Sequence, residues 1–260
     1  MNTFQTLELN NNCYKITRSK KFIKEKDFKS STIDKVFNFA YNMTLGNVGQ
    51  HRTHRSNGIK DRKQYEIFYD TFQGKLAECA VANFLSPINP NIKLDFTEKK
   101  LGYWDQGDID IFGKSIAIKS TKHFGNLLLL ECADWNNNAE YIPNIQFSKS
   151  TFDYFIMVRI KTSFVKQDLK KEWQDSNIYT NLLKVLKEKN WCYEISGYIT
   201  NEDFKSIIKN EMIIRQNYYI NSFKTKIDAN NYYVQLGDLR SPSELLKELK
   251  LLKENMNANL

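Results

Sequence analysis

The stretch of residues 107–119 reads GDIDIFGKSIAIK, and it determines the fold that we expect for this chain. Residues 108–112 and 115–119 both alternate polar and apolar side chains, and Gly113-Lys114 separates the two runs. Two alternating runs around a glycine are typical of a β-hairpin with a two-residue turn. We therefore expect a hairpin here, with Gly113 and Lys114 at its tip.

The predicted hairpin has a polar face and an apolar face. Pairing outward from the expected turn places Asp110 opposite Ala117 and Asp108 opposite Lys119. Because strand side chains alternate between faces, these four residues share one face. The isoleucines share the other face, where we expect them to be buried: Ile109, Ile111, Ile116 and Ile118. The polar face thus gathers two carboxylates and an ammonium group, and carboxylates so placed can hold Mg²⁺ next to a phosphodiester.

At these residues the chain resembles the PD-(D/E)XK nuclease superfamily and, within it, the type II restriction endonucleases. The family pattern is an Asp at the start of one strand, then an acidic residue, any residue and Lys on the hairpin partner. Asp108 matches the first acid and Lys119 matches the lysine. A Glu commonly precedes this hairpin on a helix, often after a glycine, and Glu78 has this place in residues 74–81. The run 152–160 resembles the strand that follows the hairpin in many such enzymes.

The chain departs from the family pattern at one position. Ala117 stands two residues before Lys119, where the family carries Glu or Asp, and alanine has no atom that can ligate a metal. Three explanations are open: a deliberate replacement of the acid that blocks cleavage, an acid that has moved, or a natural relative without catalysis. The clean alternation around this single position favours the first. For the second, the candidate acids are Glu78, Asp110 and Glu131.

The resemblance implies an enzyme that uses Mg²⁺ to hydrolyse phosphodiester bonds of double-stranded DNA at a short specific sequence, leaving 5′-phosphate ends. It implies that Asp108 binds the metal together with Glu78 or the acid normally at 117, with Asp110 as a further candidate ligand. Lys119 would position the attacking water, and a palindromic site would imply a homodimer. Two alternatives remain: a repair or defence nuclease without sequence specificity, and a non-catalytic DNA-binding relative, which Ala117 would suit.

Further candidates for DNA contact lie on both sides of this constellation. One group belongs to a basic, glycine-punctuated loop, and the other extends the second hairpin strand or lies beyond it. Hydroxyls and cations suit phosphate contacts, and a glutamine can bond an adenine edge through two atoms. The predicted DNA-binding residues are His51, Arg52, His54, Arg55, Ser120, Thr121, Lys122, His123 and Gln146.

Composition limits the class of protein. The 260 residues include 38 Lys and Arg against 30 Asp and Glu, giving a net charge of +8, which favours an acidic partner only weakly. Four cysteines without C-x-x-C spacing read as reduced thiols. No apolar run approaches the roughly 20 residues that span a bilayer, and no signal peptide is evident. We expect a cytoplasmic protein without a membrane partner.

The remaining pattern predicts an α/β fold, with a mixed central β-sheet, flanking helices and a restriction-endonuclease-like core. Apolar residues recur at helical spacing over 31–43 and 61–85. Residues 127–130 and 154–160 are continuous apolar runs of strand length, which fit a sheet covered on both faces. We expect a single nuclease domain over 1–260, with its core at about 60–165 and elaborations at 1–59 and 166–260.

Overall fold

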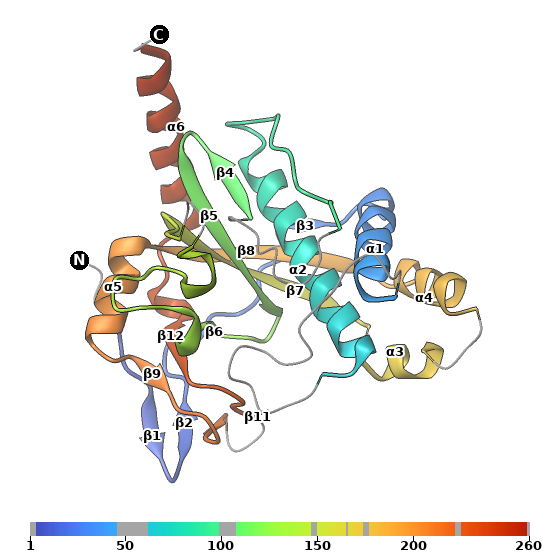
Figure 1. Ribbon diagram of the computed structural model, residues 1–260, viewed down its shortest axis with the longest axis horizontal. Coiled ribbons are helices and arrows are strands. Elements are labelled where there is room, and N and C mark those ends of the chain that lie inside the picture. The colour runs from blue at the N-terminus through green and yellow to red at the C-terminus, as the bar shows by residue number, and fades with distance from the viewer. Residues whose placement is uncertain are drawn as a thin grey trace.

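A five-stranded sheet organises the protein (Figure 1). In spatial order its strands are β3 (Lys26–Asp27), β8 (Trp191–Thr200), β7 (Tyr154–Thr162), β5 (Lys114–Lys122) and β4 (Ile109–Ile111). Strands β5 and β7 are parallel, and the other neighbouring pairs are antiparallel. The computed structural model describes residues 4–45, 62–98, 108–146, 150–164, 166–173, 177–221 and 225–258. This mixed sheet, with helices packed on it, confirms the predicted α/β class.

The hairpin of β4 and β5 turns one residue earlier than the sequence pattern predicted. Ile111 pairs with Lys114 and Ile109 with Ile116, so Phe112 and Gly113 form the tip. Both tip residues have positive φ, 50° and 75°, as a two-residue turn that matches strand twist requires. Glycine serves here as the second tip residue, whereas the prediction used it as the first. The predicted register is therefore wrong, but the division of side chains between the two faces is unchanged.

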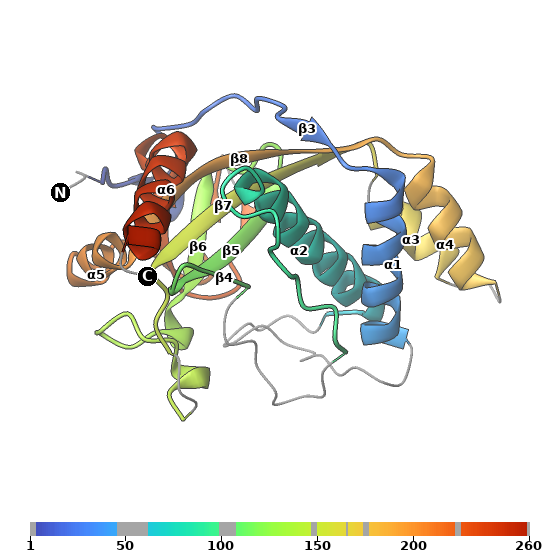
Figure 2. The ribbon, with the colours of Figure 1, turned by 90° about the horizontal axis from the view of Figure 1, so that it is seen from above.

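Helices cover the isoleucine face of the hairpin. They are α1 (Ser30–Leu45), α2 (Gln64–Leu85), α3 (Lys166–Glu172), α4 (Ile178–Lys187) and α6 (Pro242–Ala258). Figure 2 shows α2 running diagonally across the sheet, with α1 beside it. Ile109, Ile111 and Ile116 join one core cluster with α2, as the alternation predicted, whereas Ile118 is only half-buried against that cluster. Within the described ranges, none of these helices combines the length and apolarity needed to span a bilayer.

A second core cluster lies on the opposite face of the sheet. Phe155 and Met157 of β7 point there with Ala117, whereas Ile156 and Val158 join the helical cluster, so β7 is buried on both faces as predicted. The covering elements are β6 (Leu127–Glu131), α5 (Asn201–Lys209), β9 (Ile213–Ile214) and β12 (Asn231–Gln235). The remaining strands form a small sheet: β1 (Glu8–Asn10), β2 (Cys13–Lys15), β10 (Tyr219–Ile220) and β11 (Thr225–Lys226). Short 3₁₀ helices in the described part of the chain are η1 (Cys132–Asp134), η2 (Ile142–Asn144) and η3 (Leu236–Asp238).

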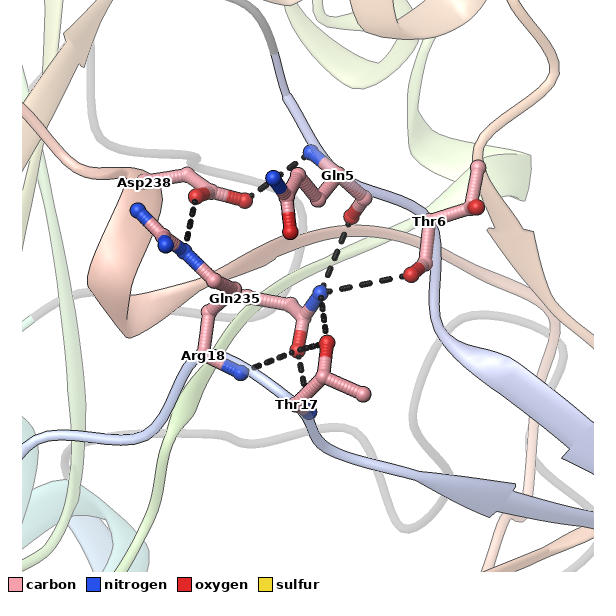
Figure 3. Close-up of polar contacts among 6 residues, drawn as sticks. All are labelled: Gln5, Thr6, Thr17, Arg18, Gln235 and Asp238. Carbon is pink, nitrogen blue, oxygen red and sulfur yellow. Dashed lines mark hydrogen bonds and ion pairs between the residues drawn. The ribbon is translucent and has the colours of Figure 1, made fainter.

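The N-terminal segment is fastened to the far end of the chain through one buried side chain. The Gln235 carboxamide oxygen accepts hydrogen bonds from the backbone amides of Thr17 and Arg18, and its nitrogen donates to the Gln5 carbonyl (Figure 3). Asp238 adds bonds to the Gln5 amide and the Arg18 guanidinium. Residues about 220 positions apart in the sequence therefore share one polar network.

Candidate nuclease-type site

Asp108 lies at the entrance to β4 and is held by β5. Its backbone amide donates to the Ile116 carbonyl, and its carboxylate accepts a hydrogen bond from the Ile118 amide. Extending the observed register by one residue places Asp108 opposite Ala117. The prediction that Asp108 faces Lys119 is wrong, because the turn occurs at Phe112-Gly113. Asp110 is exposed, one position further along β4 from the buried Ile109.

Position 117 is buried and apolar. Ala117 is 4% exposed and belongs to the same cluster as Phe155, its partner in the parallel pairing of β5 and β7. Lys119 follows two residues later and so shares this strand face. A side chain longer than alanine at 117 would extend on the face of Lys119, opposite Asp108. Position 117 is therefore next to both residues that match the motif, Asp108 and Lys119.

Glu78 lies on the other side of the sheet, in a buried ion pair. Its carboxylate is 2.6 Å from the Lys75 ammonium group, and their side chains are 11% and 7% exposed. Lys75 also donates to the Asp95 carbonyl at 2.9 Å and lies 4.6 Å from the centre of the Phe39 ring. The partner of the buried Glu78 carboxylate is thus Lys75, a contact that sequence reasoning missed. The spacing of three residues on one helix was the available signal, because such side chains are neighbours.

Lys119 borders a cleft of about 770 Å³. One wall is the N-terminal half of α2, where the Gln73 side-chain amide donates to the Ser120 hydroxyl at 3.2 Å. The C-terminal end of β5 supplies Ser120, Thr121 and Lys122, three of the predicted phosphate contacts, and all three line the cleft. Strand β6 and residues 225–231 complete it. The structure thus brings Lys119 together with these three residues.

The cleft carries charges of both signs. The cationic side chains are Arg62, Lys119, Lys122 and Lys226, and the acidic ones are Glu66, Asp70, Glu131, Asp134 and Asp228. Arg62 and Asp70 form an ion pair at 3.4 Å. Of the three acids considered as substitutes for position 117, Glu131 lines the cleft with Lys119. Sequence reasoning missed the walls at 62–73 and 225–231, since nothing local in the sequence links them to β5.

The other predicted DNA contacts have different positions. His123 continues β5, and its amide donates to the Ile160 carbonyl at 2.8 Å. Partial burial lowers the pKa of His123, and the nearby charges of Lys161, Arg159 and Lys122 act in the same direction. Gln146 is exposed beyond η2, outside the cleft lining. The predicted contacts of the basic loop, His51, Arg52, His54 and Arg55, lie outside the described residues.

Among the residues that the structure describes, the side chains do not make a complete magnesium site. The Glu78 carboxylate is bonded to Lys75, one oxygen of Asp108 accepts from Ile118, and Ala117 has no donor atom. In the part of the chain that the structure describes, no three His, Cys, Asp or Glu side chains form a group that could hold a metal ion. A complete ligand set would need an additional carboxylate, and position 117 is where the sequence pattern lacks one.

In comparisons with known proteins, no family model, curated protein or solved structure matches this chain.

Proposed function

We propose that this chain binds double-stranded DNA on the scaffold of a type II restriction endonuclease, with a restriction-endonuclease-like core, and that it lacks one acid of the catalytic set. The observation that carries the proposal is the placement of Lys119 in a cleft, on the strand face of position 117 and near Asp108. With an acid at 117, the scaffold would hydrolyse phosphodiester bonds in a Mg²⁺-dependent reaction at a short specific sequence, leaving 5′-phosphate ends.

Four neighbouring residues would hold the DNA backbone in the cleft. Lys119 and Lys122 supply positive charge, and Ser120 and Thr121 supply hydroxyl groups that bond phosphate oxygens. Gln73 holds the Ser120 hydroxyl and so fixes one of these groups before DNA arrives. The acids in the cleft favour a phosphate near Lys119 over one near Glu131 or Asp134, since like charges repel.

The decisive experiment restores a carboxylate at position 117. Ala117→Glu and Ala117→Asp are incubated with plasmid or phage DNA and Mg²⁺, and Ala117→Gln is the matched control because it has the size of Glu without its charge. We expect cleavage by the acidic variants only, and its loss when Lys119→Met is added. Defined fragments would indicate sequence specificity, whereas a smear would indicate a repair or defence nuclease.

The same experiment tests the possibility that the acid has moved. Cleavage by the chain with Ala117 intact would mean that another carboxylate already completes the site. Glu131 is the candidate, because it lines the cleft with Lys119. If the Glu131 carboxylate completes the site, Glu131→Gln would abolish cleavage. Thermal unfolding of each variant shows whether the larger side chain is accepted at this buried position.

A non-catalytic DNA-binding protein is the second candidate. The observation that favours it is the packing of Ala117 against Phe155, in an apolar cluster where alanine fits without a polar partner. It predicts DNA binding with a steep salt dependence and no cleavage by any folded variant at 117. Folded Ala117→Glu and Ala117→Asp that bind DNA without cutting it would select this candidate over the endonuclease.

DNA recognition by a homodimer is part of the endonuclease proposal. A palindromic site presents the same half-site twice, so two copies related by a two-fold axis would bind it. Sedimentation of the chain with a duplex carrying its site measures the number of copies bound.

A further inference from the structure

Three aromatic rings form a row beside the mouth of the cleft. The His123 ring lies between Phe22 and Phe124, with ring centres 6.0 and 5.2 Å away and planes inclined by 80° and 78°. Phe124 lines the cleft and is 66% exposed. Phe22 lines a separate hollow of about 580 Å³. The aromatic row of Phe22, His123 and Phe124 therefore connects the cleft with a second hollow.

The backbone fixes the row although its rings reach solvent. Gly125 donates to the Lys122 carbonyl at 2.8 Å and closes a tight turn, and the Asn126 side chain bonds the Phe124 carbonyl. A Cβ at Gly125 would come within 2.4 Å of the Thr121 hydroxyl, so this close turn requires glycine or a shift of Thr121. An exposed ring on a fixed turn loses little conformational freedom on binding.

The segment that carries Phe22 is also held in place by hydrogen bonds. The buried Arg159 guanidinium donates to the carbonyls of Lys20 and Lys21 at 2.9 and 2.8 Å, and it forms an ion pair with Glu194. Its central carbon also lies 5.7 Å from the centre of the Phe22 ring. Both ends of the aromatic row are thus attached to strands β5 and β7 through hydrogen bonds.

Exposed cations accompany the rings. The Lys122 ammonium is 5.8 Å from the centre of the Phe124 ring, and the Lys161 ammonium is 5.8 Å from that of Phe22. Lys20 and Lys21 are exposed in the segment that leads to Phe22. Two acids on the Phe22 side of the row have cationic partners, Asp27 with Lys24 and Glu194 with Arg159. Aromatic rings can stack with nucleic-acid bases, and cations beside the rings can contact the phosphates that flank each base.

We infer that the aromatic row binds the unpaired nucleotides of a DNA that carries a single-stranded segment next to its duplex. Bases stack on Phe124 and Phe22, while Lys122 and Lys161 contact the flanking phosphates. A base in a duplex already stacks on its neighbours, so a protruding ring is useful mainly to an unpaired base. The inference rests on the proposed function, because it takes the duplex to lie in the adjoining cleft.

The test compares two DNA probes, a blunt duplex and the same duplex with a single-stranded overhang. Fluorescence anisotropy measures the dissociation constant of each probe for the native chain, Phe124→Ala and Leu251→Ala. Leu251 is the matched control because it is another exposed apolar residue, 58% exposed on α6. We expect the native chain to prefer the overhang, and Phe124→Ala to weaken overhang binding about 10-fold, a loss typical of one stacked base. Blunt-duplex binding and Leu251→Ala should be unchanged.

The possible failures are distinguishable. Equal affinity of the native chain for both probes, or equal overhang affinity with and without Phe124, would overturn this inference while leaving the proposed function intact. Absence of binding to either probe would count against both. Dissociation of a dimer by Phe124→Ala, with DNA binding unchanged, would reassign the row to contacts between copies of the chain.

Discussion

The two faces of the central sheet hold their charges in different ways. On the helical face, Lys75 and Glu78 are buried against each other, and Phe39 and the Asp95 carbonyl complete the surroundings of the ammonium group. On the opposite face, Lys119 borders an open cleft. A lysine enclosed with its counter-ion is part of the core, where losing one partner is costly, whereas a lysine at a cleft is available to a ligand. The residue type alone does not distinguish the two roles.

The largest loss of stability is expected when Lys75 is removed. In Lys75→Met the ammonium partner of Glu78 is lost inside the core, and breaking a buried ion pair from one side typically costs about 3–5 kcal/mol. We expect the free energy of unfolding, measured with urea, to fall by about that amount.

The double variant Lys75→Met/Glu78→Leu serves as the control. Because it removes both charges, it should recover most of the lost stability. A single variant as stable as the native chain would mean that water reaches the pair in solution, and the two faces would then differ less than the structure indicates.

A smaller effect is expected on the cleft side of the sheet, where Asp203 and Arg240 form an ion pair at 2.6 Å. Burial raises the pKa of the Asp203 carboxyl, but hydrogen bonds from Arg240 and from Thr200 outweigh burial, so its pKa in the folded chain lies below the usual 3.8. The pair therefore stabilises the fold above pH 3.8, and this stability is lost as the pH falls towards the lower folded pKa.

Unfolding with urea as a function of pH measures this contribution against Asp203→Asn. At neutral pH the variant should be less stable by about 1.5–3 kcal/mol, the range for a hydrogen bond to a charged group. The difference should shrink as the pH falls from 3.8 towards the lower folded pKa, because the carboxyl of the unfolded chain takes up a proton first and this favours unfolding. A difference independent of pH would show that the charge of Asp203 does not contribute.

The strand pattern was predictable where it depended on neighbouring residues. Alternation in 108–119 was enough to separate the isoleucine face from that of Ala117 and Lys119, and this division holds in the structure. The tip of the hairpin was not predictable from the glycine alone, because Gly113 suits either tip position and Phe112 takes the positive φ that usually favours glycine or asparagine. The predicted pairing of Asp108 with Lys119 was wrong for that reason.

The surroundings of the predicted site depended on contacts between distant parts of the sequence. Gln73 meets Ser120 across 47 residues, and residues 225–231 join the same cleft from near the C-terminus. No local pattern encodes these contacts, since they follow from how two sheets and α2 pack. The pairing of Glu78 with Lys75, in contrast, was visible as a spacing of three on a helix.

The smallest effect on stability, and the sharpest contrast with Lys75, is expected from Lys119→Met. Lys119 is half-buried at the cleft, and no hydrogen bond or ion pair holds its ammonium group among the residues described. The free energy of unfolding should therefore change by less than about 0.5 kcal/mol. DNA affinity should fall, and the slope of its logarithm against the logarithm of salt concentration should decrease by about 1, because one phosphate contact is lost. Lys247→Met on the exposed face of α6 removes the same charge elsewhere and should leave that slope unchanged. If Lys119→Met destabilises the fold as much as Lys75→Met, the cleft is closed in solution and Lys119 is a second structural lysine.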